Sequence, residues 1–101
     1  MNLSQQIKKN EKNVRDALDV LSKQASELNL KQFNSEDVTN EIKKYRKTIE
    51  KYKKAMSGLN TAFKFMKTKN VMTIDDIPEI ENELKEFEIE FQKITKYANV
   101  G

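Results

Sequence analysis

The residues of this sequence that could carry chemistry include a run of glutamates near the C-terminal end. Paired carboxylates can act as a general acid and base, or they can hold a metal ion. On a helix these side chains point in several directions, and the sequence contains no His and no Cys to accompany them. The Glu-x-x-His pattern of carboxylate-bridged metal sites is therefore absent. We expect no enzyme, no metal and no cofactor. The glutamates are Glu79, Glu81, Glu83, Glu86, Glu88 and Glu90.

A second group with possible chemistry is basic and lies in the middle of the chain. Basic residues interleaved with aromatic ones can neutralise phosphates and stack on bases. Tyr45 and Tyr52 fall on an apolar seam, however, which places their rings in a core and favours a solvated face for the lysines. Nucleic-acid binding is therefore the alternative function. This candidate face comprises Lys43, Lys44, Arg46, Lys47, Lys51 and Lys54.

Helices that would position these residues are predicted by a repeat of apolar residues, which are spaced alternately three and four residues apart. This is the heptad signature of helices that bury one seam against other helices. It predicts an all-α fold, an elongated antiparallel three-helix bundle with coiled-coil-like packing, in a single domain over residues 1–101. One run is Val38, Ile42, Tyr45, Ile49, Tyr52, Met56, Leu59, Phe63 and Met66, and a second is Ile77, Ile80, Leu84, Phe87, Phe91, Ile94 and Ala98.

The helices are expected at about 3–28, 35–68 and 78–98. Asn29 to Asn34 interrupts the first stripe and is interpreted as a turn, with Leu30 and Phe33 folding back onto the bundle end. Ser35 suits the N-cap of the second helix. Gly58 is a weak point inside that helix, but the heptad keeps its phase across it, which favours a continuous helix over a split one.

Charge is segregated along the chain. Residues 1–34 carry a net charge of +2, residues 35–69 carry +6 and residues 70–101 carry −5. A basic second helix and an acidic third helix favour antiparallel pairing of the two. With a turn near residues 71–72, Met56 meets Phe87, Tyr52 meets Phe91, and Lys53 lies near Glu88.

The same construction for the first two helices, with a turn near residues 31–32, places Leu18 opposite Tyr45. The first and third helices are then staggered, and the N-terminal end of the second helix lacks a third partner. An open apolar seam favours association with another chain, so we expect a homo-oligomer, with a dimer favoured. The predicted contact residues for self-association or an unknown protein partner are Val38, Ile42, Leu21, Leu28, Ile89, Phe65 and Met72, the last of these in the second turn.

Composition sets the broad class. The chain has 101 residues, of which 37% are hydrophobic and 35% charged. No stretch approaches the ~18 consecutive apolar residues of a membrane span, and the first residues lack the apolar core of a secretory signal. We expect a cytoplasmic protein without membrane contact. Its function is expected to be that of a helical adaptor, assembly factor or inhibitor, and the abundance of Asn and Lys suggests a bacterial or phage source.

Overall fold

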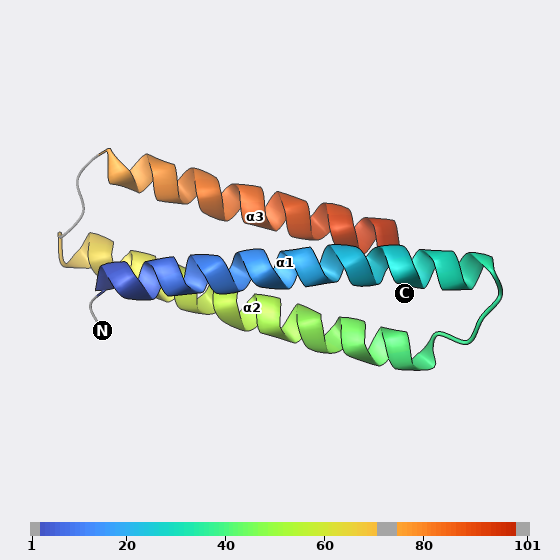
Figure 1. Ribbon diagram of the computed structural model, residues 1–101. Helices are drawn as coiled ribbons and strands as arrows, with labels where there is room; N and C mark the ends of the chain where they lie inside the picture. The colour runs from blue at the N-terminus through green and yellow to red at the C-terminus, as the bar shows by residue number, and fades with distance from the viewer. Residues whose placement is uncertain (1–2, 71–74, 99–101) are drawn as a thin grey trace.

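Three long α-helices lie side by side in the computed structural model, which describes residues 3–70 and 75–98. They are α1 (Leu3–Phe33), α2 (Thr39–Thr68) and α3 (Asp76–Ala98). Figure 1 shows that α2 runs antiparallel to both of the others, so that α1 and α3 are parallel. The bundle measures 54 × 23 × 17 Å. The predicted elongated, all-α, antiparallel three-helix bundle is confirmed, and the described ranges contain no strand.

The core of the bundle is built mainly on α1. Its heptad residues Val14, Leu21 and Leu28 are fully buried, as is Leu18 one turn from Val14. A stripe of this spacing lies on one side of a helix, because 3.6 residues make one turn. Removing these side chains from water is the main favourable term for the fold, at about 1.5–3 kcal/mol for each fully buried large aliphatic side chain.

The second helix is continuous, as favoured by its heptad phase. It passes through Gly58 without a break. Asn10 of α1 lies directly against this glycine, so that a Cβ there would stand 3.0 Å from the Asn10 side-chain oxygen. The glycine therefore allows a close approach of α1 to α2. The buried residues of α2 are Tyr45, Thr48, Tyr52, Ala55, Leu59, Ala62 and Phe63.

The boundary between the first two helices differs from the prediction. α1 continues to Phe33, and Leu30 and Phe33 are 62% and 85% exposed instead of folding back onto the bundle. Ser35 is not an N-cap, because it has φ +60 and its N–H donates to the carbonyl of Gln32 at 3.0 Å. The N–H of Glu36 donates to the carbonyl of Lys31 at 2.9 Å. This pair of bonds around a left-handed residue is a Schellman motif, which ends a helix.

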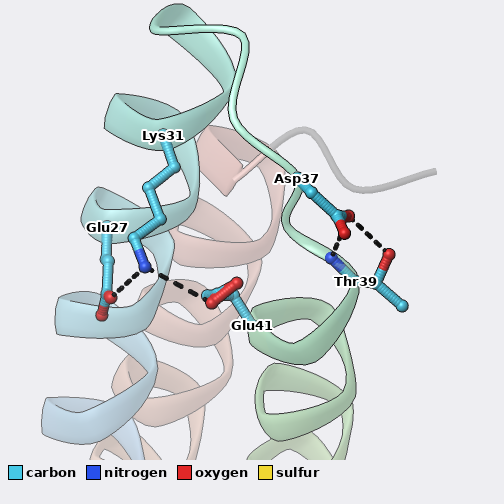
Figure 2. A network of polar contacts seen from close by, with 5 residues as sticks. All are labelled: Glu27, Lys31, Asp37, Thr39 and Glu41. Carbon is cyan, nitrogen blue, oxygen red and sulfur yellow. Dashed lines mark hydrogen bonds and ion pairs between the residues drawn. The ribbon is translucent and has the colours of Figure 1, made fainter.

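The start of α2 is stabilised by a different residue from the one predicted. An Asp37 carboxylate oxygen accepts hydrogen bonds from the Thr39 backbone N–H at 3.1 Å and from the Thr39 hydroxyl at 2.7 Å (Figure 2). These bonds lower the pKa of Asp37. Across the same turn, Lys31 reaches Glu27 at 3.1 Å and Glu41 at 3.4 Å. The pair between Lys31 and Glu41 joins the end of α1 to the start of α2, whereas Glu27 lies on α1 itself.

The predicted register of α1 on α2 is wrong, because the turn between the two helices lies later in the chain than predicted. Lys31 pairs with Glu41, and Asn10 faces Gly58, whereas the predicted register would set Asn10 opposite Lys53. Each residue of α1 therefore lies opposite a residue of α2 that is further along the chain than predicted. The cause is the later turn, which moves the centre of the helical hairpin towards the C-terminus.

The third helix packs mainly on α1. Arg15 of α1 binds Glu90 at 3.0 Å, and the Asn29 side-chain amide donates to the backbone carbonyl of Tyr97 at 2.8 Å. The expected antiparallel pairing with α2 is confirmed at two contacts. The rings of Tyr52 and Phe91 stack with centroids 4.1 Å apart, and Lys67 binds Glu81 at 3.6 Å. Figure 1 shows α3 inclined to α1, so that the two helices draw together towards the C-terminal end of α3.

A substitution at Ser35 tests the new helix boundary. A non-glycine residue in the left-handed region costs roughly 1–2 kcal/mol, so Ser35→Gly should raise the free energy of unfolding by about 1 kcal/mol. An N-capping serine would behave in the opposite way, since its replacement by Gly lowers stability slightly. Urea unfolding of wild type and variant distinguishes the two outcomes. Asp37→Ala, which removes the carboxylate that accepts the Thr39 N–H, should lower stability and serves as the comparison.

Candidate interaction surfaces

A groove of about 690 Å³ lies between α2 and α3, and we refer to it as the α2–α3 groove. The stacked rings of Tyr52 and Phe91 line it, together with the half-buried Met56. Burial and the nearby carboxylates of Glu88 and Glu90 raise the pKa of Tyr52 to about 12. The groove exists because α3 leans towards α1, which leaves the seam between α2 and α3 partly open.

The exposed rim of this groove differs in charge from one side to the other. The α2 side carries Lys53 and Lys64, and the α3 side carries Glu88 and Gln92. Lys53 and Glu88 were predicted to lie near each other, and both line the groove. Within the described part of the chain, no ion pair of 4.0 Å or less joins them.

A second groove lies between α1 and α2, and we refer to it as the α1–α2 groove. It consists of two successive hollows of about 350 and 490 Å³. The buried residues that line it are small, and they are Ala17, Ala55 and Ala62. The α1 residues that line it occupy a different side of the helix from Arg15 and Asn29, which contact α3. This groove therefore lies on the face of the α1–α2 hairpin that α3 does not cover.

The predicted contact face at the start of the second helix is only partly available. Leu21 and Leu28 are 0% exposed, so they belong to the core of the bundle and cannot contact another chain while it is folded. The prediction for these two residues is wrong, because α1 buries its heptad stripe completely against its own neighbours. Val38 and Ile42 are half-buried beside that core.

Two further apolar residues stand at the same end of the molecule. Leu30 and Phe33 are exposed on the last turns of α1, and Figure 1 shows that these turns extend beyond the end of α3. Sequence reasoning missed this exposure, because a turn placed at 29–34 would have hidden both side chains. Ser35 offered no clear signal of the helix end, because the left-handed position after a helix usually holds Gly or Asn.

The other predicted contact residues are dispersed. Ile89 is 52% exposed on α3, and Phe65 is 49% exposed at one end of the α1–α2 groove. Val20 is 45% exposed on the opposite wall of that groove. Met72 lies outside the described residues. The structure thus does not unite the predicted contact residues into one surface.

The predicted nucleic-acid face is exposed but is not aromatic. Tyr45 and Tyr52 are 2% and 4% exposed, so neither ring is available to stack on a base. Lys51 and Lys54 line the α1–α2 groove. The remaining basic residues of the candidate face are all exposed on α2, and they are Lys43, Lys44, Arg46 and Lys47.

The acidic side chains of α3 make different contacts from one another. Glu90 accepts hydrogen bonds from one Arg15 nitrogen, at 3.0 Å to each carboxylate oxygen, and the Arg15 guanidinium also lies 5.2 Å from the centre of the Phe87 ring. Burial raises the pKa of Glu83 to about 7, and a hydrogen bond with Glu11 of α1 adds to the effect. Among the described residues no three acidic side chains form a group that could hold a metal ion.

The contact of Arg15 and Glu11 with α3 is a feature that sequence reasoning missed. Both residues lie outside the apolar stripe of α1, one turn apart on the same side of the helix. Their spacing of four residues was the available signal, since a charged pair on one side of a helix can meet a neighbouring helix.

The raised pKa of Glu83 makes the α1–α3 contact sensitive to pH. Between the ordinary glutamate value and about 7, the folded chain holds a proton that the unfolded chain has lost. Stability should therefore fall as the pH rises through this window. Glu83→Gln removes the charge, so it should stabilise the bundle by about 1 kcal/mol near pH 8, after allowance for solvent screening, and by almost nothing near pH 4.

Denaturant unfolding at a series of pH values measures this difference. Glu86→Gln, on an exposed part of the same helix, is the matched control and should show no such dependence. An equal effect of Glu83→Gln at both ends of the pH range would contradict the assignment.

The chain gives no match in comparisons with known proteins. No protein-family model matches it, and neither the comparison with curated proteins nor the comparison with solved structures found a match. Within the described residues, none of the three helices has an apolar stretch sufficient to cross a bilayer.

Proposed function

We propose that this chain is a non-enzymatic protein–protein interaction module. It acts as a small helical adaptor, assembly factor or inhibitor in the cytoplasm, and it works by burying helix faces against a partner and by self-association. The observation that carries this proposal is the half-open seam between α2 and α3, where apolar residues on heptad positions stay only partly buried. These residues include Met56 and Phe91, both of which line the α2–α3 groove.

The energetic argument follows from the area that is still exposed. Full burial of a large apolar side chain contributes roughly 1.5–3 kcal/mol relative to full exposure. A half-buried Met56 or Phe91 therefore retains part of that free energy, which is released when a partner covers it. The charged rim of the groove would contribute less to affinity and more to orientation and to the association rate.

A photo-crosslinking residue placed in the α2–α3 groove tests the proposal in cells of the source organism. At Met56 or Gln92 it should yield covalent adducts with protein, because a bound partner would hold its own side chains against these positions. Matched controls at Lys47 and Glu86, which are exposed on the same two helices and do not line this groove, should yield few. Mass spectrometry of the adducts separates self-adducts from adducts with another protein.

Protein adducts of equal yield at all four positions would contradict the proposal, as would an absence of protein adducts at Met56 and Gln92. The measurement is informative whether the partner is a second copy or a different protein. It therefore tests the interaction function separately from the identity of the partner.

A nucleic-acid function is the second candidate, and one observation favours it. Lys44, Lys47, Lys51 and Lys54 form an exposed stripe along one side of α2, at helical spacings of three and four. Such a stripe could neutralise backbone phosphates without reading the bases. The burial of Tyr45 and Tyr52 opposes any mode that depends on base stacking.

Titration of duplex and single-stranded DNA at two salt concentrations measures this candidate. For a protein-interaction module we expect only non-specific binding at physiological salt, with a dissociation constant of about 10⁻⁴–10⁻⁶ M. A tighter affinity that disappears in a Lys47→Glu, Lys51→Glu double variant would instead support the nucleic-acid function. A Lys8→Glu, Lys9→Glu double variant controls for net charge, since it makes the same charge change at exposed positions of α1, away from this stripe.

A further inference from the structure

We propose that the α2–α3 groove binds a second copy of this chain in a two-fold symmetric dimer, in which Lys53 faces Glu88 of the partner subunit. The proposal rests on the interaction function above and deepens it by naming the occupant of the groove. It follows from three properties of the groove: its apolar floor, the opposite charges of its two walls and the position of these charges along it.

The apolar part of the floor provides the surface to be buried, and the polar residues Ser57, Asn60 and Thr61 line the groove beside it. Tyr52 and Phe91 stack in parallel, with an angle of 2° between their rings, and Met56 lies in the same groove. Phe91 and Met56 are each only half-buried by the three helices of one chain. A second copy presents the same floor, so two grooves that face each other would place apolar surface against apolar surface.

The charges of the walls make the groove complementary to itself. The α2 wall carries Lys53 and Lys64, and the α3 wall carries Glu88. These local charges agree with those of the whole segments, since residues 35–69 have a net charge of +6 and residues 70–101 have −5. A single copy therefore offers one basic and one acidic wall, which is the pattern that a self-complementary two-fold contact requires.

The same charges select one symmetry axis. A two-fold axis across the groove would place α2 on the partner's α2, so that lysines would face lysines. An axis along the groove places α2 on the partner's α3. A residue of α2 then meets the residue of the partner's α3 that lies at the same position along the groove. Lys53 and Glu88 line the same groove without an ion pair between them. The axis along the groove would therefore bring each of them to its opposite charge on the partner.

Reciprocal charge reversal tests this arrangement directly. Sedimentation equilibrium of wild type should show a dimer that weakens as salt is added, because the rim pairs are screened. Lys53→Glu alone sets two glutamates against each other at both symmetry-related pairs, and Glu88→Lys alone sets two lysines there. Each variant should therefore dimerise at least tenfold more weakly than wild type.

An equimolar mixture of the two variants should restore the dimer, because each chain then meets the opposite charge on its partner at both positions. Restoration in the mixture identifies a contact between chains, since a contact within one chain could not be repaired by adding a second variant. Native mass spectrometry confirms that the restored species contains one chain of each variant. Lys47→Glu and Glu86→Lys are the matched controls, with the same charge changes at exposed positions that do not line the groove.

Several results would overturn the proposal. These are a wild-type monomer at high micromolar concentration, a dimer that neither reversal weakens, and a mixture that stays monomeric. Circular dichroism verifies that each variant stays helical. Should a reversal unfold the chain, the neutral variants Lys53→Gln and Glu88→Gln should weaken the dimer several-fold, and unchanged dimerisation by them would also overturn it. A monomer that still forms groove adducts with another protein would leave the interaction function standing and remove only the second copy.

Discussion

The packing of α1 against both other helices is the interaction on which the rest of the structure depends. The fully buried large side chains of α1 are Val14, Leu18, Leu21 and Leu28, whereas α2 contributes Leu59 to this set and α3 contributes none. Arg15 and Asn29 on another side of α1 then hold α3 through Glu90 and the carbonyl of Tyr97. Loss of α1 would therefore remove the shared surface on which the two remaining helices are placed.

The unequal packing also explains where the molecule can interact. Because α3 leans towards α1, the seam between α2 and α3 is bridged by the stacked rings of Tyr52 and Phe91 but leaves Phe91 and Met56 only half-buried. The opposite face of the α1–α2 hairpin is lined instead by alanines and by Gly58, which allow the two helices to approach closely. That close approach accounts for the small residues there without a ligand. The half-open α2–α3 seam has no such internal explanation, and for this reason it carries the proposed function.

The fold class could be predicted from the sequence because apolar periodicity is a local property that tertiary contacts then use. The three helices and the continuity of α2 through Gly58 followed from it. The helix boundary could not be predicted in this way, since serine is a preferred N-cap residue and left-handed positions usually hold Gly or Asn, whereas Ser35 takes the left-handed role. The register of α1 on α2 depends on that turn, so one wrong assignment displaced every pair along the two helices.

The interaction surfaces were harder to predict than the fold, because the exposure of each side chain depends on which helix α3 packs against. Charge segregation favoured α2 as the partner of α3, but ion pairs at an exposed rim contribute only about 0–1 kcal/mol each. On α1, Arg15 combines a short contact to Glu90 with a position over the Phe87 ring. A guanidinium that makes a charge-assisted hydrogen bond and covers an aromatic face gains from both interactions. Between α2 and α3, Lys67 pairs with Glu81 at 3.6 Å, whereas Lys53 and Glu88 form no ion pair within one chain. The proposed dimer would bring these two residues to an opposite charge.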